Sequence, residues 1–264
     1  LEEREANAEK IVELKAINEK LEAKTKIQHI ASRISEKAND RLMTDKSFQS
    51  LFNNSSNYEI VVVAIDIRRS TELMLKAKSP THFSDFITGL RRILSEIIIS
   101  NFGVFDKFTG DGILDVFPKF YSGEDAIIRA IKATSECHCA FEQYYKNSRH
   151  CFTVIPKDTG LGIGIDFGPA TLMNTQNELT VVGSPVVYAC RFSGAMAGET
   201  LINQSAKEEI ERLCPQNDNF SETELFIKNE GNTIAYKVHL HEASYQINDP
   251  DWERLTLQYK KAKS

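Results

Sequence analysis

The sequence lacks the features of a membrane-spanning or secreted chain. It contains no run of about 18 consecutive apolar residues, roughly the length that crosses a bilayer as a helix. A secretory signal is also missing, because no basic stretch followed by an apolar one opens the chain. We therefore expect no membrane segment within this chain. Its first residue is Leu1 rather than Met, and we expect the natural protein to extend upstream.

The sequence has no excess of positive charge. Its 32 Lys and Arg residues are outnumbered by 37 Asp and Glu residues, which gives a formal net charge of −5 and an isoelectric point near 5.8. A nucleic-acid-binding domain usually carries a basic surface. We therefore expect no nucleic-acid partner.

Cysteine is scarce and irregularly placed, which argues against a disulfide framework. An odd number of cysteines without regular spacing is typical of a protein in the reducing cytoplasm, where we expect this chain. A metal cluster at residues 137–139 is disfavoured, because adjacent side chains on a helix point in different directions. The five cysteines are Cys137, Cys139, Cys151, Cys190 and Cys214.

Residues 1–50 form a region of their own, rich in Glu, Lys, Ala and Ile and free of Gly and Pro. Their apolar residues recur at helical spacing in a narrow stripe between charged flanks. We expect a long amphipathic helix over residues 1–45 that pairs as a coiled coil, followed by a polar linker at residues 52–57. A helix packed on its own domain is the alternative. The stripe consists of Ile11, Leu14, Ile17 and Leu21, continued after a shift in phase by Ile27, Ile30 and Ile34.

The rest of the sequence alternates strand and helix patterns. Residues 60–65 are continuously apolar, which is typical of a strand buried on both faces. Helices are expected over residues 81–100 and 123–147, with a hairpin turn at residues 109–112 between them. Residues 159–174 alternate apolar side chains with glycines, which indicates a strand that another part of the backbone approaches closely.

The order of these elements predicts the fold class. It is β-α-β-β-α-β followed by α-β-α-β-β, which is typical of an α+β protein with a ferredoxin-like core and C-terminal additions. With 264 residues, 41% of them hydrophobic, the chain is long enough for one sizeable core and an extra element. We expect the domain to span residues 58–241 and a tail to occupy residues 242–264.

Two aspartates lie where this fold would bring them together. Asp66 ends the first strand and precedes a turn into a helix, and Asp111 lies on the hairpin turn. Neighbouring carboxylates repel, and divalent cations between paired aspartates are a standard arrangement for phosphoryl displacement. The alternatives are a helix N-cap for Asp66 and a plain turn residue for Asp111.

Four segments, in this order, carry a resemblance to a known family: AIDIRRST, FDKFTGDGILDVF, TGLGIGIDFGPA and TVVGSPVVYACRFSGAMAGE. Over residues 58–241 the sequence resembles the class III nucleotidyl cyclase domain. The resemblance implies a homodimer with active sites at the interface and two Mg²⁺ or Mn²⁺ ions per site, with Asp66, Ile67 and Asp111 as the metal ligands. It implies attack of the ribose 3′-hydroxyl of a nucleoside triphosphate on the α-phosphate, with loss of pyrophosphate.

The same resemblance implies roles for further residues. Lys107 and Thr180 take the positions that read the base, and Arg191 takes that of the arginine that stabilises the transition state. Lys228 matches the lysine that binds the terminal phosphates, and Gly110 lies beside the catalytic Asp111. The turn that would hold the triphosphate consists of Ile67, Arg68, Arg69, Ser70 and Thr71.

The sequence also departs from the family pattern. Val187 stands where the family has an Asn that orients the ribose, so either another residue such as Tyr188 takes that role or the domain is slow or inactive. Arg68 and Arg69 stand where purine cyclases commonly have small or apolar residues, and a long cation there would narrow the pocket. The Glu and Cys pair of guanylyl cyclases is absent.

This combination resembles one branch in particular, the pyrimidine cyclases of the bacterial Pycsar anti-phage system. That resemblance implies UTP, or less often CTP, as the substrate, and a separate effector that senses the cyclic product. Two alternatives stay open. Lys107 and Thr180 favour a bacterial adenylyl cyclase, and Val187 favours a degenerate nucleotide-binding dimerisation module without activity.

Overall fold

The computed structural model describes residues 14, 15, 18, 25, 27–53, 56–175, 178–215, 220–227, 231–238 and 247–261. Within them the strands are β1 (Asn57–Arg68), β2 (Val104–Thr109), β3 (Gly112–Pro118), β4 (Gly160–Thr175), β5 (Glu178–Val182), β6 (Glu199–Ile202), β7 (Phe220–Ile227) and β8 (Gly231–Val238). The helices are α2 (Asn39–Thr44), α3 (Lys46–Asn53), α4 (Ser70–Lys76), α5 (Pro80–Ser100), α6 (Lys119–Ser122), α7 (Ala126–Asn147), α8 (Ser184–Phe192), α9 (Gln204–Leu213) and α10 (Trp252–Lys261). None of the helices in this part of the chain is long and apolar enough to cross a membrane.

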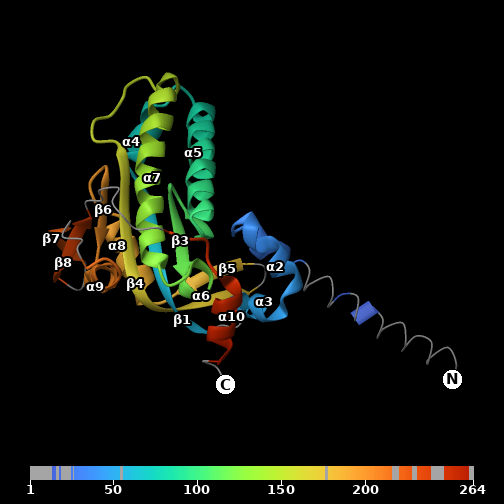
Figure 1. The fold of residues 1–264 in the computed structure, drawn as a ribbon. Helices are drawn as coiled ribbons and strands as arrows, with labels where there is room; N and C mark the ends of the chain where they lie inside the picture. The colour runs from blue at the N-terminus through green and yellow to red at the C-terminus, as the bar shows by residue number, and fades with distance from the viewer. Residues whose placement is uncertain are drawn as a thin grey trace.

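The strands form one mixed sheet in the order β2-β3-β1-β4-β6-β8-β7, with β5 paired to β4 alone (Figure 1). β1 runs antiparallel to both β3 and β4, and β4 runs parallel to β6. The first four strands and the helices between them follow the order β-α-β-β-α-β. The predicted α+β class and ferredoxin-like core are therefore confirmed.

Helices cover both faces of the sheet around β1. Val61, Val63 and Ile65 point to one face and pack against α5 and α7, the two long helices that lie side by side in Figure 1. Ile60 and Val62 point to the other face, where α3, α6 and α8 cover them. The prediction of a strand buried on both faces is confirmed.

The N-terminal region differs from the single long helix that we expected. The helix ends at Ala31, a turn follows, and the chain then forms a short 3-10 helix and the helices α2 and α3. Ile30 and Ile34 are buried in the core of their own domain. For these residues the alternative, a helix packed on its own domain, is correct. The stripe before residue 27 and its coiled coil fall almost wholly outside the described residues; Leu14 is described, and it is exposed.

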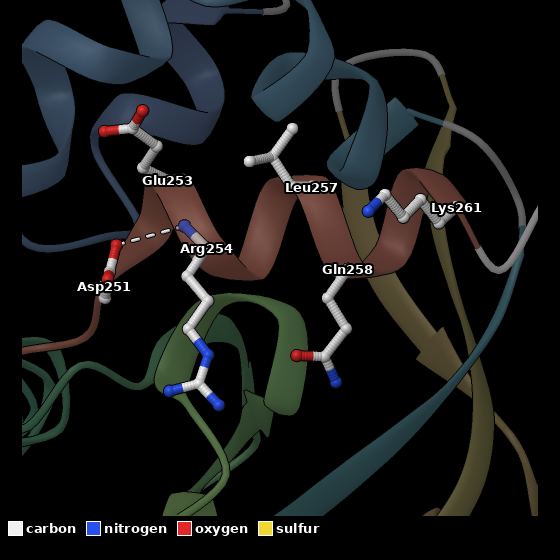
Figure 2. A pocket seen from close by; sticks show the side chains of 6 residues that line it. All are labelled: Asp251, Glu253, Arg254, Leu257, Gln258 and Lys261. Carbon is white, nitrogen blue, oxygen red and sulfur yellow. Dashed lines mark hydrogen bonds between the residues drawn. The ribbon is translucent and has the colours of Figure 1, made fainter.

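The expected C-terminal tail contains a helix that belongs to the domain. α10 lies against α3 and α6 (Figure 1), and its Trp252 indole donates a 2.9 Å hydrogen bond from Nε1 to the carbonyl oxygen of Tyr121. The Trp252 and Tyr121 rings are stacked, with centroids 6.1 Å apart. The aromatic residues of α3 and α6 need an apolar cover on this face, and α10 supplies it. Its outer side borders a surface hollow, shown in Figure 2, that is lined by Asp251, Glu253, Arg254, Leu257, Gln258 and Lys261.

Candidate active site

Asp66 and Asp111 lie close together at one end of β1. The register pairs Ile65 of β1 with Ile113 of β3, so the end of β1 lies beside the turn that joins β2 and β3. Burial raises the pKa of Asp66, the negative charge of Asp111 raises it further, and Arg68 opposes both effects. The charge of Asp111 thus acts on Asp66, as expected if the two carboxylates lie near each other.

The hairpin turn is pressed against β1. Thr109 pairs with Gly112, which leaves Gly110 and Asp111 as a two-residue turn. Gly110 has a φ of 67°, a conformation that favours glycine at this position of a hairpin turn. At Gly112 an added Cβ would overlap the carbonyl oxygen of Ile65. The glycines on either side of Asp111 therefore hold it against the end of β1.

The predicted phosphate turn supplies polar partners to both aspartates. Arg68 donates from Nη1 to Oδ2 of Asp66 at 2.7 Å, and the Ser70 hydroxyl donates to Asp111. Arg69 has a φ of 66°, a left-handed conformation that a non-glycine residue rarely adopts, and its guanidinium pairs with Glu72 at 3.0 Å. Thr71 is exposed in the first turn of α4. Both arginines are thus tied to acidic side chains of their own segment.

The donor atoms here fit a hard divalent cation. The two carboxylates repel each other, and Arg68 pairs with Asp66 alone, which is a situation that Mg²⁺ or Mn²⁺ can resolve. The Ile67 side chain is 2% exposed, so this residue has only its backbone carbonyl to offer as a ligand. The described residues contain no group of three or more His, Cys, Asp or Glu that could hold a metal. Further ligands would have to come from backbone, water or substrate.

A second group of polar residues joins β2 to β5. Lys107 donates from Nζ to the Thr180 hydroxyl at 2.7 Å, although the two residues are 73 positions apart in the sequence. The Thr180 hydroxyl donates in turn to Oδ2 of Asp106 at 3.3 Å. The structure therefore brings the two expected base-reading residues together and adds a carboxylate that the sequence analysis missed.

Asp106 occupies a β-bulge. The register shifts between Phe105 and Lys107, so Asp106 is the extra residue on β2. Its side chain is 3% exposed, and burial raises its pKa to about 6 against the opposing effects of Lys107, Val181, Thr180 and Arg33. A regular strand would place Asp106 and Lys107 on opposite faces. Since a bulge is not evident in the sequence, only the acidic residue next to Lys107 could have signalled this site.

Helix α8 presents Arg191 on its exposed side. Gly164 of β4 lies directly under this helix, because an added Cβ would overlap the carbonyl oxygen of Ala189. The prediction that another backbone closely approaches the glycine-rich strand is confirmed. Arg191 is exposed and forms no ion pair with the part of the chain that the structure describes. Its charge and that of Lys107 both lower the pKa of Cys190, which burial raises, so Lys107 lies near α8.

Val187 lies one turn before Arg191 and is 48% exposed, so an apolar surface stands beside the arginine. Tyr188, the suggested substitute for the missing Asn, packs its ring against Phe192 at a centroid distance of 6.2 Å. Lys228 lies outside the described residues. Among the described residues no hydrogen bond or ion pair joins Asp66 and Asp111 to Asp106, Lys107 or Thr180. Asp66, Asp111 and the turn after β1 thus form one polar group, and Asp106, Lys107 and Thr180 form another.

The fold is similar to those of solved adenylyl and guanylyl cyclase structures. The chain is similar to the adenylyl cyclase CyaB from P. aeruginosa, with 20% identity, a TM-score of 0.61 and coverage of 72% of this chain and 98% of that one. The fold is that of a nucleotidyl cyclase catalytic domain.

Two further structures extend the comparison. The guanylyl cyclase Cya2 aligns with 19% identity and a TM-score of 0.61 over 74% of this chain and 99% of that one. The guanylate cyclase domain of RhGC from Catenaria anguillulae, solved with GTP, aligns with 19% identity and a TM-score of 0.54 over 71% and 100%. No protein-family model and no curated protein matches the sequence.

Proposed function

We propose that this protein is a nucleotidyl cyclase, which converts a nucleoside triphosphate into a 3′,5′-cyclic nucleotide and pyrophosphate. The observation that carries the proposal is the convergence of Asp66 and Asp111 at the end of β1, on a fold shared with cyclase domains. The unpaired Arg191 and the Lys107–Thr180 pair add the anion-binding and base-reading groups that the reaction requires.

The two aspartates, with the backbone carbonyl of Ile67, would hold two divalent cations. Bound Mg²⁺ or Mn²⁺ supplies activation of the ribose 3′-hydroxyl and charge neutralisation at the α-phosphate. Ser70 orients the Asp111 carboxylate through its hydroxyl. Burial raises the pKa of Asp66, and the neighbouring Arg68 guanidinium opposes that rise because it favours the charged form.

The turn after β1 in one protomer and Arg191 of its partner would together hold the substrate's triphosphate. Arg68, Arg69, Ser70 and Thr71 surround the turn after β1 and offer side-chain and backbone donors to phosphate oxygens. Arg191 is free to place its planar guanidinium on the α-phosphate, where negative charge grows during the reaction. Lys228 is proposed to bind the terminal phosphates, in keeping with the family resemblance.

The active unit is proposed to be a homodimer. The family resemblance implies active sites at the interface of two chains, and among the described residues no hydrogen bond or ion pair joins Asp66 and Asp111 to Lys107 and Thr180 within one chain. In the dimer Asp66 and Asp111 of one protomer would face Lys107, Thr180 and Arg191 of its partner. A guanylyl cyclase domain of similar fold, from the RhoGC fusion protein of Blastocladiella emersonii, has been crystallised both as a non-canonical dimer and as a monomer.

The base contacts favour ATP over UTP as the substrate. Lys107 and Thr180 form one hydrogen-bonded pair, as expected for the adenylyl cyclase alternative. The case for a narrowed pyrimidine pocket depended on Arg68 or Arg69, and both arginines are held by acidic residues of their own segment. A pyrimidine cyclase with a separate anti-phage effector therefore has only the motif resemblance in its favour.

A second candidate has one specific observation in its favour. Val187 is exposed next to Arg191 and cannot hydrogen-bond a ribose hydroxyl, which suits a nucleotide-binding dimerisation module without activity. This candidate and the cyclase differ in turnover but not in fold.

A product assay tests the proposal. The purified chain is incubated separately with ATP, GTP, CTP and UTP, with Mg²⁺ or Mn²⁺, and products are separated against 3′,5′-cyclic standards. We expect 3′,5′-cyclic AMP with release of pyrophosphate. Cyclic UMP would restore the pyrimidine cyclase, and binding of nucleotide without any product would favour the dimerisation module.

A further inference from the structure

We infer that Asp106 is a positioning residue that, through its hydrogen bond with Thr180, makes this site select bases whose Watson–Crick edge carries an amino group beside an acceptor ring nitrogen. The inference rests on the proposed function and deepens it, because it names the chemical feature of the base that is read. Asp106 touches neither phosphate nor metal ligands, and it acts through the hydroxyl of Thr180.

The first step concerns the three hydrogen-bonding sites of the Thr180 hydroxyl, which has one proton and two lone pairs. Lys107 is a donor without any acceptor, so the 2.7 Å contact from its Nζ occupies one lone pair of Thr180. An ionised carboxylate is an acceptor only, so the contact with Oδ2 of Asp106 takes the Thr180 proton. One lone pair remains, and Thr180 can only accept a hydrogen bond from the substrate.

The second step concerns the neighbouring Lys107, whose remaining protons can only donate. The site therefore presents a donor next to an acceptor. Adenine and cytosine match this pattern, with a ring nitrogen that accepts beside an amino group that donates. On the same Watson–Crick edge, guanine and uracil present a carbonyl beside a ring nitrogen that carries a proton, which is the opposite polarity. A site built around a hydrogen bond of one polarity rejects the reverse strongly.

The third step concerns what keeps Asp106 in place. It is the extra residue of the β2 bulge, it is 3% exposed, and the Val181 backbone N–H of β5 also stabilises its charged form. Arg33, from the N-terminal region, donates to the carbonyl oxygens of Phe105 and Asp106, which fixes the backbone of the bulge. These contacts hold the carboxylate against Thr180 rather than in solvent.

The test compares ATP with inosine triphosphate, which carries a carbonyl in place of the adenine amino group. The quantity measured is the ratio of kcat/KM for the two nucleotides, in the wild-type chain and in Asp106→Asn. The Asn amide can donate to Thr180 and so free its proton for the substrate. We expect the preference for ATP to fall by about tenfold or more, with turnover of inosine triphosphate rising relative to ATP. A purely structural role would lower both rates equally.

Two variants serve as controls. Asp115→Asn changes the other buried carboxyl of the same hairpin, which makes no hydrogen bond with Thr180, and should leave the ratio unchanged. In a Thr180→Val background, Asp106→Asn should have no further effect on the ratio, because its route to the base is gone. The inference is overturned if Asp106→Asn leaves the ratio unchanged. It is also overturned if Asp106→Asn lowers the ratio equally in the Thr180→Val background, or if the wild-type protein prefers inosine triphosphate.

The pH dependence of the wild-type ratio decides the matter if Asp106→Asn does not fold. The charged and titratable groups that face Asp106 are Lys107 on its own strand, Arg33 from the N-terminal region and Asp115 on β3. Protonation of Asp106 below about pH 6 turns its carboxyl into a donor, so the preference for ATP should fall there. A ratio that changes by less than about twofold between pH 5 and pH 8 would contradict the role of Asp106.

Failure of the proposed function is distinguishable from failure of this inference. If no triphosphate is cyclised, the cyclase proposal fails, and the inference is then judged by calorimetric binding of 3′-deoxy-ATP and 3′-deoxy-inosine triphosphate. Tighter binding of the adenine compound that is lost in Asp106→Asn supports the inference. Equal affinity for both, or no binding of either, overturns it.

Discussion

The β2–β3 hairpin carries acidic residues in two regions with opposite environments. At its turn, Asp111 accepts a hydrogen bond from the Ser70 hydroxyl and lies near Asp66 at the proposed ligand site. Away from the turn, Asp115 is fully buried, and neither of its carboxyl oxygens has a hydrogen-bond partner in the described part of the chain. Burial and the charge of Asp106 raise the pKa of Asp115 well above its ordinary value.

The difference shows that residue type alone does not identify a functional acid. A carboxyl without partners in a dry interior gives up its charge, because neutralisation costs less than burying an unpaired ion. A carboxyl at the rim, next to a second one and to polar side chains, has oxygens that can bind a cation. The four predictions below test this contrast.

The largest expected effect is on turnover at the rim. Asp66→Ala or Asp111→Ala should lower kcat by about 100-fold or more, because each removes a carboxylate from the proposed metal site. Steady-state kinetics with Mn²⁺ measure the loss. Asp85→Ala, an exposed acid on α5, is the matched control and should keep wild-type rates. Retention of activity in Asp66→Ala would contradict the assignment.

The second effect concerns Arg191. Arg191→Ala should lower kcat by about 100-fold or more while KM changes much less, because its charge is needed mainly in the transition state. Arg191→Lys should recover only part of the rate, since an ammonium group lacks the planar fork. Separate determination of kcat and KM checks the point, and a rise in KM alone would make Arg191 a ground-state phosphate ligand.

The third effect is on stability and concerns the buried end of the hairpin. Because the pKa of Asp115 is raised in the folded state, the folded protein binds more protons than the unfolded chain above about pH 4. The free energy of unfolding therefore falls as pH rises, by at most about 1.4 kcal/mol per pH unit for this group.

Asp115→Asn removes that dependence, and its stability advantage over wild type should grow from pH 4 to pH 7 in urea denaturation. If Asp115→Asn were destabilised equally at both pH values, Asp115 would not be neutral in the folded protein.

The smallest effect separates backbone from side chain at Arg69. Its left-handed conformation costs a non-glycine residue about 1–2 kcal/mol. Arg69→Gly should therefore be about 1 kcal/mol more stable than Arg69→Ala, which keeps the strain and loses the exposed pair with Glu72. Thermal unfolding of the two variants measures the difference. Equal melting temperatures would show that the turn relaxes without cost.

Some features of the candidate site could be predicted from sequence because their signals are local. The apolar run before Asp66 predicted a buried strand, and the glycines around Asp111 predicted a tight turn; β1 and the hairpin agree with both. The N-terminal stripe misled us over Ile30 and Ile34, because an apolar helix face looks the same whether a second chain or its own domain covers it. Ile30 and Ile34 pack in one buried cluster with the aromatic residues of α3, α6 and α10, so their own domain covers them.

The sequence by itself determined the order of strands and helices, and it placed one aspartate at the end of a strand and another on a turn. Hydrophobic periodicity and glycine conformation depend on near neighbours, so they can be read along the chain. Only the tertiary structure decided that Asp106 leaves the regular strand pattern at a bulge and meets Thr180, 74 positions away. Such a contact depends on how β2 and β5 converge, and no local pattern encodes that convergence.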